Sequence, residues 1–155
     1  MTELVHPTHI FVCGNEPQNA VRFITAFQVN VLEVVRNYFN KPVLMNNYHY
    51  GGDNVGKGTR AITYRPKGGS LTSDHYTANA VDPTIENISP EEFFLEATKH
   101  GSKLNVLLRS VGVNTIEDVT FTPTWNHLGR RNFWTGEKDG YFNENKTEII
   151  RIIKP

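Results

Sequence analysis

The sequence predicts an α+β fold in which two or three helices pack against a small antiparallel sheet that carries the functional site. Three observations predict this class. A long helical pattern occupies the first part of the chain, two shorter helical segments lie in the middle, and short β-rich segments follow them. With 155 residues, 38% of them hydrophobic, the chain suits one domain with one continuous core, and we assign residues 1–155 to it.

The first elements in chain order are a short strand or packed arm at Ile10–Cys13 and a long helix at Gln18–Phe39. In that helix, apolar residues recur at steps of three and four, and the pattern stops before Pro42. The segment Pro42–Asn47 is predicted as a strand. The glycine-rich stretch Gly51–Gly69 that follows is typical of a loop.

The middle of the chain predicts one strand and two helices. Ala78–Asp82 alternates small and apolar residues and stops at Pro83, which predicts a buried strand with Asp82 at its tip. Ser89–Lys99 reads as a helix, because a serine N-cap is followed by proline and two acidic residues. A glycine interrupts the pattern, and Lys103–Ser110 resumes it.

Three late segments are β-rich and are predicted as hairpin strands. They are Thr115–Glu117, Val119–Thr122 and Thr124–Leu128. No internal repeat, low-complexity tract or domain boundary is visible in the sequence, which agrees with a single domain.

Composition excludes several classes of function. Lysine plus arginine and aspartate plus glutamate are equal at 16 each, so no charge excess attracts nucleic acid or an anionic membrane. The lone cysteine, Cys13, excludes an intramolecular disulfide and a thiolate-rich structural zinc site. No apolar stretch approaches the roughly 20 residues that span a bilayer, and no signal peptide is visible. We therefore expect a protein that is made soluble in the cytoplasm. If it works outside a cell, something else must deliver it, for example a virion with which it is associated.

One group of residues predicts a metal site. His75 lies just before the predicted strand, Asp82 lies on it, and the small residues Ala78 and Ala80 leave room for an ion. His127 adds a second imidazole on a late strand. Two histidines and one aspartate leave a fourth tetrahedral position open for water, which is the ligand count of a catalytic zinc site. Zinc lowers the pKa of such a water to roughly 7, so the implied reaction is hydrolysis.

A family resemblance rests on three phrases: Ser73-x-His75, Ala80-x-Asp82 and Trp125-x-His127. They resemble the signature S-x-H-x-x-G-x-A-x-D, then W-x-H, of the zinc D-alanyl-D-alanine carboxypeptidases and L-alanyl-D-glutamate endopeptidases. Members of that family hydrolyse peptidoglycan and include many phage lysins and virion proteins. The resemblance covers residues 43–131 and implies a phage-type zinc metallopeptidase acting on the stem peptide.

The resemblance also implies roles for individual residues. The metal ligands would be His75, Asp82 and His127. Arg60 would bind a carboxylate or carbonyl of the substrate, a task that suits the bidentate guanidinium fork. Arg65, in the phrase Tyr64-Arg65-Pro66, is the competing arginine. Further substrate contacts would come from Ser73, Tyr76 and Trp125.

Three positions depart from the family pattern. Ala78 replaces a glycine, which is tolerable if the backbone there is extended. Thr124 stands where many members have the carboxylate general base, and Gly129 replaces a frequent acid. Glu117 could reach across the predicted hairpin and serve as the base, whereas the competing interpretation places Glu117 and Asp118 in an ordinary polar turn.

Two functions therefore remain open. The first is an active zinc peptidase in which Arg60 holds the stem peptide and Glu117 transfers the proton. The second is a metal-binding virion or structural protein that kept the fold and the ligands but lost the base, with other virion proteins as its partners.

Overall fold

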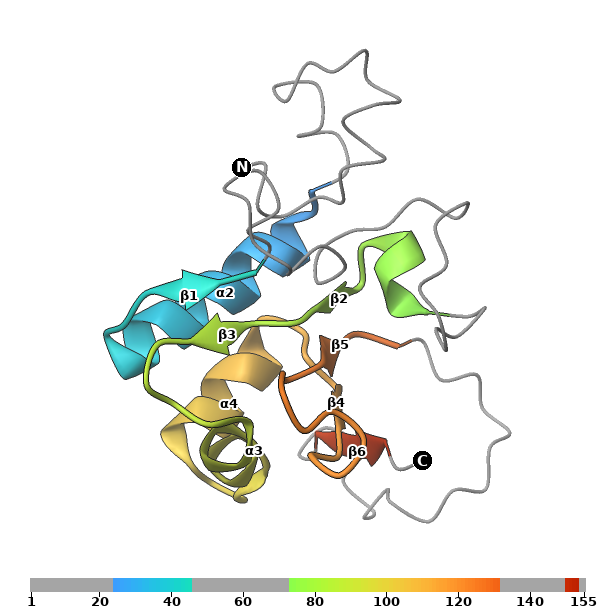
Figure 1. Ribbon diagram of the computed structural model, residues 1–155. Coiled ribbons are helices and arrows are strands. Elements are labelled where there is room, and N and C mark those ends of the chain that lie inside the picture. The colour runs from blue at the N-terminus through green and yellow to red at the C-terminus, as the bar shows by residue number, and fades with distance from the viewer. Residues whose placement is uncertain (1–23, 46–72, 132–149, 154–155) are drawn as a thin grey trace, which may run out of the picture.

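Three α-helices and six short strands form the part of the chain that the computed structural model describes, residues 24–45, 73–131 and 150–153. The predicted α+β class is confirmed, because separate helices pack around short, mainly antiparallel strands (Figure 1). The predicted strand Ile10–Cys13 and the predicted loop Gly51–Gly69 lie outside the described residues.

Helix α2 (Ala26–Phe39) is the longest element. It begins at Ala26, because Thr25 is extended and caps the helix at its first turn, and the predicted residues 18–23 lie outside the described residues. The cap is reciprocal: Thr25 Oγ1 accepts from the Gln28 N–H, and Gln28 Oε1 accepts from the Thr25 N–H at 3.1 Å. Asn40, in the left-handed conformation, ends the helix before the proline, as the sequence predicts.

Helices α3 (Pro90–Thr98) and α4 (Lys103–Ser110) agree with the predicted segments. Each begins after a serine cap, and the Ser89 side chain accepts from the Glu92 N–H at 3.1 Å. The two helices are tied together where they meet, since Asn105 Nδ2 donates to the Ala97 carbonyl at 2.7 Å. Helix α4 also packs against α2, so α4 contacts both of the other helices.

The larger sheet contains β2 (Ala80–Val81), β5 (Leu128–Gly129), β4 (Thr115–Glu117) and β6 (Arg151–Ile153), in that order. The pairs β2/β5 and β5/β4 are antiparallel, whereas β4 and β6 are parallel. A second antiparallel sheet pairs β1 (Val43–Leu44) with β3 (Thr84–Ile85). Strand β6 was not predicted from the sequence.

Two of the predicted late strands are corrected by the structure. Val119–Thr122 forms turns instead of a strand, because the Asp118 carboxylate and carbonyl accept hydrogen bonds from the following residues. Of the predicted strand Thr124–Leu128, only Leu128 joins the sheet. The partner of β4 is therefore a shorter strand that begins directly after His127.

A continuous hydrophobic core joins the helices to the sheet. Its members are Phe27, Val31, Val35, Met45, Val81, Ile85, Phe93, Ala97, Leu104, Leu108, Val113, Ile116, Leu128 and Ile150. Val81 and Leu128 are fully buried and face each other in the register of β2 and β5. Burial of these two side chains fixes the pair of strands whose ends carry the candidate site. Within the described residues, no helix is long and apolar enough to cross a bilayer.

Candidate metal centre

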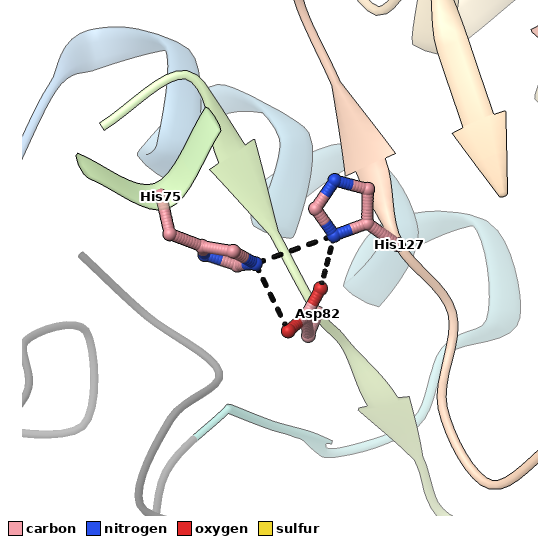
Figure 2. A group of neighbouring side chains, drawn as sticks. All are labelled: His75, Asp82 and His127. Atoms are coloured by element: carbon pink, nitrogen blue, oxygen red, sulfur yellow. Dashed lines mark hydrogen bonds and ion pairs between the residues drawn. The ribbon is translucent and has the colours of Figure 1, made fainter. Parts of the chain in front are cut away.

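The β2/β5 pair brings together three side chains that are far apart in the sequence. Asp82 follows β2 directly and His127 precedes β5 directly, so antiparallel pairing places them at the same end of the two strands. His75 comes from a short 3-10 helix, η4 (Asp74–Thr77), which leads into β2. Figure 2 shows the three side chains pointing toward one another.

The three side chains form a closely spaced, buried group. The Nε2 atom of His75 lies 3.2 Å from Nδ1 of His127. The two Asp82 oxygens lie 3.1 Å from His75 Nε2 and 2.8 Å from His127 Nδ1. His75, Asp82 and His127 are 0%, 3% and 6% exposed. The predicted ligands therefore meet in one buried cluster that can hold a metal ion.

The spacing of these atoms suits a tetrahedral cation. Bonds of about 2.0–2.1 Å at tetrahedral angles separate neighbouring ligand atoms by about 3.3 Å. The three spacings, 2.8, 3.1 and 3.2 Å, are close to that value. A cation would therefore need only small movements of the side chains to bind all three atoms.

Protons satisfy the same three atoms less well than a cation does. If both imidazoles donate to Asp82, their two N–H groups face each other across 3.2 Å. If one imidazole donates to the other, only one of them donates to the carboxylate. A cation accepts a lone pair from all three atoms at once, so the donor set fits a metal.

Comparison of the chain with protein-family models, with curated proteins and with solved structures found no match. The functional assignment therefore rests on the residues of the cluster and on their surroundings.

Electrostatics binds the cluster together in its metal-free form. Burial would raise the pKa of Asp82, but the charges and hydrogen bonds of His75 and His127 outweigh it and hold that pKa well below its ordinary value. Burial opposes the charge on His127, but the Asp82 carboxylate outweighs it and raises the pKa of His127. A metal entering the cluster therefore competes with a firmly held proton.

Glu117, the predicted base, lies on β4 next to the cluster. Its N–H donates to the His127 carbonyl at 3.1 Å, and its side chain is half-buried. Burial raises the pKa of the Glu117 carboxyl; the charge of His127 opposes that rise, and the charge of Asp82 adds to it. The carboxyl is thus within electrostatic range of two cluster members. The role as base remains a prediction.

The other predicted site residues fall into two groups. Arg60 and Arg65 lie outside the described residues. Ser73 caps η4, with its Oγ accepting from the His75 N–H at 3.4 Å. Tyr76 lies on η4 and Trp125 lies in the turn region before His127, and both side chains are partly exposed.

Ala78 requires a correction. The sequence interpretation accepted alanine there on condition that the backbone was extended, whereas Ala78 adopts the left-handed conformation with φ of 55°. A side chain with a Cβ is strained in that region, and glycine is not. The position therefore has the backbone geometry for which glycine is suited, and alanine is retained at a cost in free energy.

The residues that hold these segments in place were not predicted from the sequence. Helix α2 is attached to the segment that carries Asp82: Thr25 Oγ1 donates to the Ala78 carbonyl at 3.0 Å, and Gln28 Nε2 donates to the Ala80 carbonyl at 3.3 Å. Gln28 is fully buried. The capping residues Thr25 and Gln28 are visible in the sequence. Their hydrogen bonds to the carbonyls of the segment that carries Asp82 are not, because both acceptors lie more than 50 residues away.

Proposed function

We propose that this protein is a zinc-dependent peptidase that hydrolyses a peptide bond in the stem peptide of peptidoglycan, and that it is phage-encoded. The observation that carries the proposal is the buried convergence of His75, Asp82 and His127 at near-tetrahedral spacing. The order of these residues along the chain, and the residues that flank them, resemble the signature of the zinc peptidoglycan carboxypeptidases and endopeptidases.

The donor set favours zinc over other cations. Two imidazole nitrogens and one carboxylate oxygen suit zinc, whereas calcium and magnesium prefer sites made of oxygen alone. Three protein ligands leave a position open, which distinguishes a catalytic site from a closed structural one. When bound there, zinc would supply an activated water and polarisation of the scissile carbonyl.

The remaining steps are assigned to side chains of the chain itself. Glu117 would accept the proton of the attacking water and later donate it to the leaving amine. Its place supports this role, since the β4/β5 pairing holds its backbone against His127 and its carboxyl interacts with the charges of the cluster. The Glu117 side chain is half-buried, so part of it would be accessible to a substrate.

Substrate binding is assigned to residues around the cluster. Arg60, or in its place Arg65, would pair with a substrate carboxylate through its guanidinium fork. The Ser73 hydroxyl accepts from the His75 N–H, so its own proton is left to donate to a substrate. Tyr76 and Trp125 are partly exposed and would line the peptide groove.

A second candidate function is a metal-binding virion or structural protein without hydrolytic activity, whose partners would be other virion proteins. Two positions favour it. Thr124 is exposed and is not a carboxylate. A Cβ at Gly129 would lie 2.5 Å from Thr115 Oγ1, so an acidic side chain does not fit at that position without movement of β4.

One experiment separates the two functions. Purified peptidoglycan is incubated with the zinc-loaded protein, with the chelated protein and with Asp82→Asn, and new peptide termini are identified by mass spectrometry. A peptidase would release new peptide termini only in the zinc-loaded sample, and the chelated protein would regain this activity when zinc is returned. Binding of one zinc per chain with no new termini would instead establish the metal-binding protein.

A further inference from the structure

The two imidazoles of the cluster are carried by segments with little structure of their own. His75 belongs to the four-residue helix η4. His127 belongs to the loop before β5, and β5 pairs with β2 over two residues only. Something beyond these short ladders must set the position of η4 relative to the β5 segment, because a metal site tolerates errors of only a few tenths of an ångström.

An ion pair outside the cluster joins the two segments. Asp74, the residue before His75, accepts from the Nε–H of Arg131, which follows β5 by two positions. The Asp74 side chain is 15% exposed and the Arg131 side chain 33%. The pair is thus largely shielded from water, which makes a hydrogen-bonded ion pair stronger than one on an open surface.

The arginine end of the pair is itself fixed by the fold. The Arg131 N–H donates to Asn114 Oδ1 at 2.9 Å, and its carbonyl accepts from Asn114 Nδ2 at 2.8 Å. The Asn114 backbone N–H donates to the Gly129 carbonyl at 3.0 Å. Asn114 therefore extends the β4/β5 ladder up to Arg131, so the guanidinium starts from a backbone held by the sheet.

Asp74 also packs against β5, at Gly129. A Cβ at Gly129 would stand 3.6 Å from Asp74 Oδ2 and 3.7 Å from the Asn79 carbonyl. The carboxylate of Asp74 therefore lies against the face of β5 from which a side chain at position 129 would project. Helix η4 therefore packs directly on the strand that follows His127.

We infer that Asp74 and Arg131 act as a positioning pair for the metal centre: their ion pair sets η4, and with it His75, at the distance from His127 that a metal requires. The inference deepens the proposed function and rests on metal binding at the cluster. Neither residue is one of the three ligands. The positioning effect passes through the backbone of η4 and the β5 segment, and it is separate from the charge that Asp74 exerts on His127.

The test is a double-mutant cycle on zinc affinity with Asp74→Asn, Arg131→Gln and both together. Each single variant should weaken zinc binding by about tenfold, which is the usual effect of disturbing groups that support metal ligands. The double variant should also lose about tenfold in zinc affinity and not a hundredfold, because the first substitution already breaks the ion pair in which the second residue takes part. Arg36→Gln, which removes an exposed arginine in the last turn of α2, is the matched control and should keep wild-type affinity.

Two further measurements separate positioning from general loss of stability. The visible spectrum of bound Co²⁺ reports ligand geometry, and it should change in both single variants but not in Arg36→Gln. A merely destabilised protein would show a lower melting temperature of the metal-free form with an unchanged Co²⁺ spectrum. If Arg131→Gln does not fold, Arg131→Lys serves in its place, since lysine keeps the charge but loses the planar Nε–H donor.

Three outcomes overturn the inference. Single variants with zinc affinity within twofold of wild type would show that the pair does not position the ligands. Additive losses in the double variant would show that the two residues do not act as a unit. A wild-type protein that binds no zinc would overturn the metal-dependent function and this inference together, whereas the first two outcomes leave that function standing.

Discussion

Thr25 and Ala78 are joined by a hydrogen bond across 53 positions of sequence, with the threonine hydroxyl donating to the alanine carbonyl at 3.0 Å. The same hydroxyl accepts from the Gln28 N–H, so one oxygen both caps α2 and anchors the turn that leads to Asp82. The position of the candidate metal-binding cluster thus depends on the first turn of a helix that contributes none of its three residues.

Thr25→Ala should therefore lower both stability and metal affinity. Loss of an N-cap costs about 1–2 kcal/mol of unfolding free energy, and the freed turn should weaken zinc binding as well. Denaturant unfolding and zinc titration measure the two effects. Ser89→Ala is the control, because Ser89 caps α3, which carries no residue of the cluster; it should lower stability alone. Equal zinc affinities in the two variants would contradict the anchoring role of Thr25.

Ala78→Gly should stabilise the protein. Relief of the left-handed strain at φ of 55° is worth about 1–2 kcal/mol, from which the greater flexibility of glycine in the unfolded chain subtracts about 0.5–1 kcal/mol. The expected gain is several tenths of a kcal/mol, visible as a higher denaturant midpoint. Ala80→Gly is the matched control: Ala80 is fully buried in β2, so the same change there should destabilise. A loss of stability in Ala78→Gly would refute the strain argument.

Gly129→Ala should destabilise the protein by about 1–3 kcal/mol, because the new methyl would lie 2.5 Å from Thr115 Oγ1 within a buried part of the sheet. Thr115→Ala removes the opposing atom, so the double variant should recover most of the loss. Thermal melts of the two single variants and the double variant measure the coupling. No recovery in the double variant would mean that another neighbour, such as Asp74, is what the methyl displaces.

The metal-free and zinc-loaded proteins should respond differently to pH. The raised pKa of His127 means that its stabilising proton is fully in place below the ordinary histidine value and is lost as pH rises through the raised value. The metal-free melting temperature should therefore fall as pH rises from about 6 toward 9. Zinc must displace that proton, so zinc affinity should rise over the same range. The melting temperature of the loaded protein should rise only up to the ordinary histidine pKa, about 6.5, because above it the unfolded chain also carries no proton on this side chain. Parallel slopes in the two samples would argue against zinc at His127.

Glu117→Gln should reduce peptide hydrolysis by about 10²- to 10⁴-fold while leaving one zinc bound, if Glu117 is the proton acceptor. Zinc content by elemental analysis and product release from peptidoglycan are the two measurements. Glu86→Gln removes an exposed acid in the turn after β3 and should keep wild-type activity. Undiminished hydrolysis in Glu117→Gln would remove Glu117 from the mechanism.

The sequence by itself predicted the features that short stretches of chain specify. The bounds of α4 and the serine cap of α3 follow from local side-chain hydrogen bonds and from periodicity, and both agree with the structure. Asp82 lies at the tip of a buried strand that ends at a proline, as predicted, but that strand is Ala80–Val81 and not Ala78–Asp82, because Ala78 ends η4. The three metal-binding candidates were named from their residue types, and the cluster brings them together.

Only the tertiary structure decided the rest, because the interactions concerned join residues that are distant in the chain. Val119–Thr122 has strand-forming residues, yet hydrogen bonds to Asp118 hold this segment in turns. Strand β6 forms by pairing with β4, which is far from it in the sequence. Ala78 adopts the left-handed conformation because it is the residue at which η4 ends. The Asp74–Arg131 pair joins two segments that are 57 positions apart in the sequence. A sequence pattern of short range does not encode such distances, which are set when the core brings the strands into register.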